Sequence, residues 1–156
     1  FVSKSPMPLQ DRISEDLKDA MRQKDELRRS TLRMIRSAIQ YEEINEKKAL
    51  SDAATIDILS RMARQHQESI AEYKRGGRHD LVEREEAELS LIRQYMPEQL
   101  SKQELTELAR KAIEYVNAVG PSDMGKVMAQ LMPQVRGRSN GSEVSQVVQQ
   151  ILSQQG

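Results

Sequence analysis

Residues 51–77 of this chain read SDAATIDILSRMARQHQESIAEYKRGG, and this stretch decides the fold class. Its apolar residues recur every three or four positions, which is the spacing of one face of an α-helix. The stripe consists of Ile56, Leu59, Ala63, His66, Ile70 and Tyr73. Ser51 or Asp52 can cap the start of this helix, and Gly76-Gly77 ends it, because glycine adopts the left-handed geometry found after helices. The alternation of three and four predicts a seam against a neighbouring antiparallel helix.

The same periodicity continues on both sides of this helix. Before it, helices are expected over about residues 9–24 and 26–48, and after it over about residues 80–95. Pro97 then ends the fourth helix, because proline cannot continue a helical hydrogen-bond ladder. We therefore predict an all-α N-terminal domain of about four helices over residues 7–96.

A C-terminal three-helix bundle is expected over residues 97–156. Ser101 and Glu104 have the spacing of a capping box, in which each side chain binds the backbone amide of the other residue. The remaining boundaries are expected at turn and capping residues: a stop at Gly120-Pro121, a cap at Ser122 or Asp123, a turn at Gly137, and a capping pattern at Asn140 and Glu143.

The composition is helical and excludes several classes of protein. Aromatic residues make up only 3% of the chain and there are eight methionines, whereas strand-rich proteins favour β-branched and aromatic residues. The 24 basic and 24 acidic residues cancel, so the whole chain exerts no long-range attraction on nucleic acid or membranes. The lack of cysteine excludes disulfides and fits a reducing cytosol, so we expect a cytoplasmic protein. No segment approaches the roughly 18 apolar residues of a membrane span. Residues 1–6 precede Met7, which fits a natural start, and are interpreted as a remnant outside the fold.

Two motifs that could indicate a catalytic or metal site are interpreted as structural. Residues 120–127 read GPSDMGKV and match a phosphate-binding loop, except that Val127 stands where Ser or Thr would hold magnesium. His66 is interpreted as a histidine at the edge of the core, because one histidine without a carboxylate or thiolate partner binds metal poorly. His79 is interpreted as a turn residue that faces water.

Acidic residues crowd the helix that follows, but they indicate a solvated face, because runs of charge on a helix are usually exposed. These residues are Glu83, Glu85, Glu86 and Glu88. We therefore expect no catalytic residue, no metal site and no cofactor in this chain.

Basic residues form the clearest candidate binding surface. From residue 124 to residue 142 the chain has no acidic residue and three basic ones: Lys126, Arg136 and Arg138. Arg136 and Arg138 flank Gly137 just before the last helix, whose first amides would point outward near Gly141. Helix starts attract phosphate through these amides, and arginines add bidentate contacts. The pattern predicts either contact with an RNA backbone or three ordinary surface cations.

A second basic row is a weaker candidate for RNA binding. It consists of Arg29, Arg33 and Arg36 on the polar side of the second helix. Acidic residues bracket this row and would weaken its attraction for phosphate: Asp25, Glu26, Glu42 and Glu43.

Several stretches together resemble the GatB/YqeY family. The C-terminal ones are Asp123-Met124-Gly125-Lys126-Val127-Met128, Met132-Pro133, Val135-Arg136-Gly137-Arg138, Gly141 and Val144. The others are Met21 to Ala38, Leu81 to Glu88, and Tyr95-Met96-Pro97-Glu98-Gln99-Leu100. The resemblance covers about Leu9 to Leu152 and is to a free-standing YqeY-like protein.

The resemblance implies a helical N-terminal domain followed by a three-helix bundle. It also implies a link to tRNA-dependent amidotransferases, which are carbon–nitrogen ligases with glutamine as amido-N-donor. In these enzymes a similar domain is the tail of the GatB subunit and helps to hold tRNA. The candidate tRNA-backbone residues that it implies are Lys126, Arg136, Gly137, Arg138 and Gly141. Asn140 stands where the family usually has Asp, and Asn caps a helix equally well.

Three functions follow as hypotheses. The first is a non-catalytic tRNA-binding module that contacts backbone phosphates. The second is an adaptor that offers a Met-rich apolar groove to amidotransferase subunits or to another protein. The third, an enzyme that itself transfers amide nitrogen, ranks last because the chain shows no nucleophile, metal site or nucleotide site.

Overall fold

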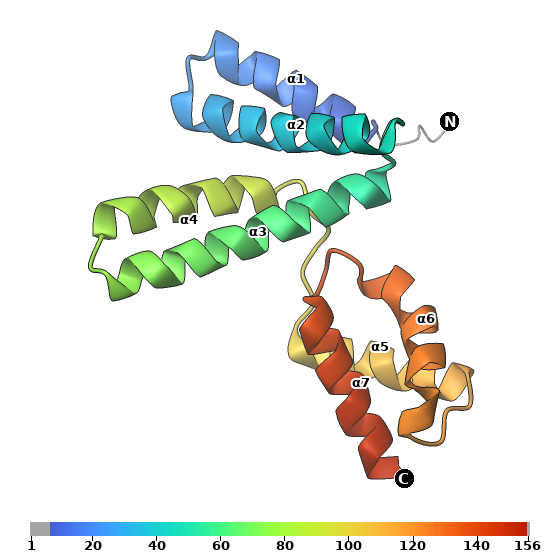
Figure 1. The fold of residues 1–156 in the computed structure, drawn as a ribbon. Helices are drawn as coiled ribbons and strands as arrows, with labels where there is room; N and C mark the ends of the chain where they lie inside the picture. The colour runs from blue at the N-terminus through green and yellow to red at the C-terminus, as the bar shows by residue number, and fades with distance from the viewer. Residues whose placement is uncertain (1–6, 156) are drawn as a thin grey trace, which may run out of the picture. The chain divides into compact units, whose positions relative to one another are not determined.

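A computed structural model describes residues 7–155, and the expectation for residues 1–6 lies outside them. Over the described residues the chain forms seven α-helices, one short 3-10 helix and no strand, which confirms the predicted all-α class (Figure 1). The helices are α1 (Leu9–Arg22), α2 (Glu26–Glu46), α3 (Asp52–Arg75), α4 (His79–Arg93), α5 (Lys102–Tyr115), η1 (Pro121–Asp123), α6 (Met124–Val135) and α7 (Gly141–Gln155). The chain divides into two compact units between Met96 and Pro97.

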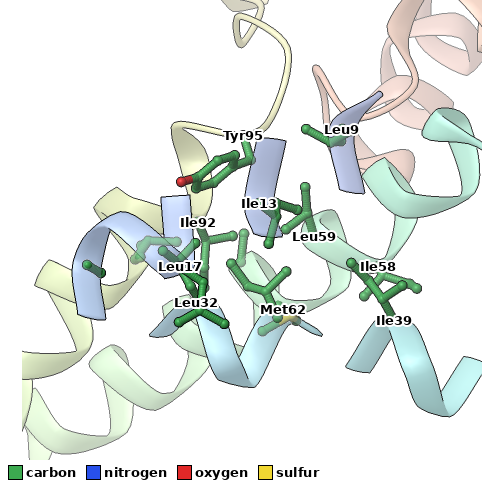
Figure 2. Packing of buried hydrophobic residues seen from close by; sticks show 14 of the residues in the cluster. Leu9, Ile13, Leu17, Leu32, Ile39, Ile58, Leu59, Met62, Ile92 and Tyr95 are labelled. Atoms are coloured by element: carbon green, nitrogen blue, oxygen red, sulfur yellow. The ribbon is translucent and has the colours of Figure 1, made fainter. Parts of the chain in front are cut away.

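The first unit consists of two helical hairpins, α1 with α2 and α3 with α4 (Figure 1). Each helix contributes at least one side chain with no exposed surface: Ile13, Leu32, Ile35, Leu59 and Ile92. Figure 2 shows Ile13, Leu17 and Leu32 close to Ile92 and Met62 in this core. Burying one such aliphatic side chain stabilises the fold by about 1.5–3 kcal/mol. The apolar stripes predicted from the sequence therefore meet in one core.

Capping and long-range hydrogen bonds fix the ends of these helices. The Ser51 hydroxyl accepts a hydrogen bond from the Ala54 amide at 3.2 Å, so Ser51 is the cap of α3. Asp52 is the first residue of α3, and its Oδ1 accepts from the Leu9 amide at 3.1 Å. Just after the end of α4, the Tyr95 hydroxyl donates to Asp16 Oδ2 at 2.6 Å, and the Arg12 guanidinium lies over the Tyr95 ring. These bonds tie α1 to segments that are distant in the sequence.

The second unit contains α5, η1, α6 and α7 around its own core. Its largest fully buried side chains come from all three α-helices: Leu105, Val127, Leu131, Val135, Val144, Val148 and Leu152. The predicted capping box is present at the start of α5. The Ser101 hydroxyl accepts from the Glu104 amide at 3.1 Å, and the Ser101 amide donates to Glu104 Oε1 at 2.9 Å.

Two boundaries in the second unit differ from those predicted. Helix α5 ends at Tyr115 rather than near Gly120, because Asn117 takes the left-handed conformation (φ 56°) that stops a helix. Asn tolerates this conformation better than other residues with a side chain. Asp123 precedes α6 but makes no side-chain cap; its Oδ2 instead accepts a hydrogen bond from the Val119 amide at 2.9 Å. The carboxylate therefore closes the loop after α5.

None of the helices in the described part of the chain is both long enough and apolar enough to span a membrane.

Candidate nucleic-acid interface

Lys126 lies in the first turn of α6 and is already paired with a carboxylate. Its Nζ is 3.7 Å from Asp123 Oδ1, and 60% of the lysine side chain remains exposed. The pKa of Asp123 is lowered, first by the hydrogen bond from the Val119 amide and less by the charge of Lys126. Exposed ion pairs contribute only about 0–1 kcal/mol, so Lys126 can exchange this partner for a phosphate at small cost.

The loop between α6 and α7 is held by hydrogen bonds to the start of the second unit. The Gly137 carbonyl accepts from Gln99 Nε2 at 2.7 Å, and the Arg138 carbonyl accepts from the Leu100 amide at 2.9 Å. Gly137 has a φ of 75°, which glycine reaches without the strain that a Cβ would cause. The loop is therefore fixed in shape.

The Arg138 guanidinium takes part in this attachment. Its Nε donates to the Glu98 carbonyl at 3.0 Å, and Nη1 donates to the Gln134 carbonyl at 3.3 Å. The pKa of Glu104 is lowered, mainly by the hydrogen bond from the Ser101 amide, with a smaller contribution from the charge of Arg138. Arg138 thus has a structural role that sequence reasoning did not foresee, beside its candidate role toward RNA.

Arg136 and Gly141 lie at the two ends of the same loop. Both residues are exposed, and a Cβ built at Gly141 would meet no atom within 4 Å, so packing does not require glycine there. Asn140 Oδ1 accepts a hydrogen bond from the Ser142 amide at 2.9 Å, so the cap already engages one amide at the start of α7. The surface at Gly141 is open to a ligand, with fewer unpaired amides than an uncapped helix offers.

The structure brings together four of the five candidate residues and separates the fifth. Arg136, Gly137, Arg138 and Gly141 lie in or next to one loop. Lys126 lies in the first turn of α6 and Arg136 directly follows the last residue of that helix, so about ten helical rises, or about 15 Å along the axis, separate the two residues. A single phosphate cannot bridge that distance, so the two cations can only contact different phosphates of a polyanion.

The weaker basic row lies on α2, in the first unit. Arg29 is paired with Glu26 at 2.7 Å, as the bracketing acids suggested. Arg33 is exposed and Arg36 is half-buried. This row therefore presents less available charge than its residue count indicates.

Sequence reasoning missed a cluster of ionisable side chains between α3 and α4. His66 Nε2 lies 3.0 Å from Glu88 Oε1 and 3.5 Å from Glu85 Oε2. The interpretation of His66 as lacking a carboxylate partner is therefore wrong. Glu88 is also buried, at 7% exposure, so the acidic run is not uniformly a solvated face. The signal was present, because His66 belongs to the inner stripe of α3 and the two glutamates are three residues apart on the next helix.

Comparison with known proteins identifies the family. A family model described as Yqey-like protein matches residues 10–152. The chain belongs to this family. It is 31% identical over 144 residues to "Altered inheritance of mitochondria protein 41, mitochondrial" of Pyrenophora tritici-repentis, an alignment that covers 90% of this chain and 79% of the relative. The identically named protein of Lachancea thermotolerans is 41% identical over 54% of this chain and 46% of its own length. That of Eremothecium gossypii is 35% identical over 76% of this chain and 67% of its own length.

These relatives correct the expected location. They are named as mitochondrial proteins, which contradicts the cytoplasmic location expected from the sequence. The physical reason for the error is that a lack of cysteine shows only that a fold needs no oxidising compartment. It does not distinguish between the compartments in which thiols stay reduced.

Proposed function

We propose that this YqeY-family chain is a non-catalytic tRNA-binding module that contacts backbone phosphates and serves tRNA-dependent amidotransferase chemistry in mitochondria. The observation that carries the proposal is the loop between α6 and α7. Its shape is fixed by the hydrogen bonds from Gln99 and Leu100, and it presents Arg136 and Arg138 beside the open start of α7. A fixed loop loses little conformational entropy when it binds.

The charge distribution of this segment supports contact with a polyanion. Lys126 and Arg136 lie at opposite ends of α6, and no acidic residue occurs between residues 124 and 142. Cations spaced along a surface neutralise successive phosphates and release their counterions, which gives affinity without base specificity. The mitochondrial location is proposed from the names of the relatives, and the amidotransferase link from the family resemblance.

A salt titration tests this proposal. Filter binding of total tRNA to the full chain is measured at 50 and 200 mM salt. Three phosphate contacts predict a loss of affinity of about 40-fold over this range, and one contact predicts about 3-fold. The variant with both Lys126→Gln and Arg136→Gln should therefore bind more weakly and show the smaller salt effect. Arg138 is left unchanged because its guanidinium also holds the loop.

The matched control removes two positive charges elsewhere in the same unit. Arg110→Gln with Lys111→Gln changes two exposed residues of α5 and should keep the salt effect of the wild-type chain. Equal salt effects in the wild-type chain and the Lys126/Arg136 variant would contradict the proposal. A control that loses as much affinity as that variant would show attraction by net charge instead of by this segment.

A protein adaptor is a second candidate, favoured by one surface feature. Met124, Met128 and Met132 of α6 are half-buried against the core of the second unit. A groove of about 490 Å³ lies beside the end of α5, lined in part by Ile113, Val119 and Ile151. Val119 is 74% exposed there, as is the nearby Tyr115. Pull-down after nuclease treatment should recover a protein with the wild-type chain and not with Val119→Asp.

A further inference from the structure

The cluster between α3 and α4 contains three ionisable side chains with little access to water. His66 is 8% exposed and Glu88 is 7% exposed, while the Glu85 side chain is 23% exposed. The two helices form an antiparallel hairpin (Figure 1), which brings the middle of α3 against the acidic part of α4. Burying ionised groups is costly unless a counter-charge compensates them. Arg84 supplies one such counter-charge, because its Nε lies 3.2 Å from Glu88 Oε2.

The tautomer of His66 follows from one contact. Its Nδ1 lies 3.0 Å from the Met62 carbonyl oxygen, which can only accept a hydrogen bond. Nδ1 therefore carries a proton, and in the neutral ring Nε2 is left with a lone pair. That lone pair faces two carboxylate oxygens, from Glu88 at 3.0 Å and from Glu85 at 3.5 Å. Three acceptor atoms that face one another require a cation among them, either a proton or a metal ion.

The separations of these atoms match those of metal ligands. Zinc binds histidine nitrogen and carboxylate oxygen at about 2.0–2.2 Å, so two ligand atoms of a tetrahedral ion lie about 3.4 Å apart. The two distances from Nε2 bracket that value, and the three ligand atoms all lie within 4.8 Å of one another. An ion can therefore be placed among them with small side-chain rotations.

The surroundings of the three side chains also resemble those of a metal site. The proton of His66 Nδ1 points to a backbone carbonyl, which fixes the ring with Nε2 toward the cluster. Arg84 Nε donates to Glu88 Oε2 at 3.2 Å, which orients that carboxylate with its other oxygen toward His66. Hydrogen bonds of this kind behind the ligands are typical of protein metal sites.

We propose that His66, Glu85 and Glu88 bind a divalent transition-metal ion, of which Zn²⁺ fits best, and that this ion joins α3 to α4. Imidazole and carboxylate ligands suit zinc more than calcium or magnesium, which prefer oxygen ligands alone. Three protein ligands leave one position of a tetrahedral ion for water, on the side of the more exposed Glu85. The site is separate from the basic loop of the second unit and does not depend on the function proposed for it.

Isothermal titration of the chelator-treated full chain with ZnCl₂ at neutral pH tests the site. We expect one ion per chain for the wild type. Glu85→Gln changes the most exposed ligand and should weaken binding by at least about 10-fold while the helical circular dichroism is retained. Arg84→Gln leaves all three ligands in place and should weaken binding by about 10-fold through the loss of the orienting hydrogen bond. His79→Gln removes the other histidine, which is exposed, and should leave binding unchanged.

Nitrogen NMR of the His66 ring separates the metal ion from a proton. Addition of Zn²⁺ should shift the Nε2 resonance and leave a proton on Nδ1. A ring that keeps protons on both nitrogens in excess Zn²⁺ would overturn the proposal and assign a buried imidazolium between two carboxylates. The absence of saturable binding, or equal losses in Glu85→Gln and His79→Gln, would also overturn it.

Discussion

Replacing Arg138 with alanine removes the side chain that holds the loop between α6 and α7. The guanidinium donates to the Glu98 carbonyl at 3.0 Å and to the Gln134 carbonyl at 3.3 Å. A hydrogen bond from a charged donor contributes about 1.5–3 kcal/mol, but exposure to water and the longer second contact reduce this. We therefore expect the free energy of unfolding of the second unit to fall by about 1–2 kcal/mol.

The consequence is measurable because the second unit is small. In a domain of this size, 1 kcal/mol shifts the midpoint of thermal unfolding by about 4–8 °C, so Arg138→Ala should lower that midpoint by about 4–16 °C. Amide hydrogen exchange on the full chain gives a local measurement. The Leu100 amide donates to the Arg138 carbonyl, so it should exchange faster once the loop is loosened.

Two further variants isolate the role of the guanidinium. Lys126→Ala also removes one positive charge from the second unit, but it breaks only an exposed ion pair and should cost no more than about 1 kcal/mol. Arg138→Lys keeps the charge but lacks the planar guanidinium that donates to two carbonyl groups from separate nitrogens. It should therefore recover only part of the stability. An unfolding midpoint for Arg138→Ala that equals that of Lys126→Ala would refute the reasoning.

Two other predictions concern pH. The hydrogen bond from the Ser101 amide lowers the pKa of Glu104, so the stabilisation by this carboxylate is complete above its ordinary value of 4.5 and is lost as pH falls through the lowered folded-state pKa. Glu104→Gln keeps an acceptor but does not titrate. Unfolding followed by circular dichroism should therefore show a weaker dependence of stability on pH in acid than the wild type shows. A variant with the same pH dependence as the wild type would contradict this role of the Glu104 carboxylate. Burial and the hydrogen bond to Asp16 raise the pKa of Tyr95 far above its ordinary 10.0. The stabilisation by the neutral phenol is therefore complete below pH 10 and is lost as pH rises further. In urea unfolding at pH 7, Tyr95→Phe should have a free energy of unfolding about 1–2 kcal/mol lower than that of the wild type. Above pH 10 the free energy of unfolding should fall less in this variant than in the wild type.

Features that depend on neighbouring residues could be predicted from the sequence. The stripe from Ile56 to Tyr73 lies on one face of a helix whatever else the chain does, and Leu59 is fully buried in the structure. The capping box of Ser101 and Glu104 needs only a spacing of three residues, and it is present. Glycine was a less reliable guide to where a helix ends. Helix α5 ends before Asn117, because this asparagine, and not the glycine that follows it, takes the left-handed conformation.

Features that depend on how segments meet could not be predicted. Whether Glu85 and Glu88 face His66 is set by the register of α4 along α3, and a sequence pattern gives the faces of two helices without giving that register. The role of Arg138 depends in the same way on a carbonyl 40 residues earlier in the chain. Positive charge was visible in the sequence, but the extent to which each cation is already engaged was not.

The hydrogen bond between Tyr95 and Asp16 has a consequence for synthesis on the ribosome. The two residues are 79 positions apart, and translation at about 5–20 residues per second takes about 4–16 s to cover that distance. During that interval α1 can pair with α2, but the carboxylate of Asp16 has no phenol to accept from. The contacts of α1 are therefore complete only after Tyr95 has been synthesised. A chaperone that recognises apolar segments of nascent chains would find this one accessible for several seconds.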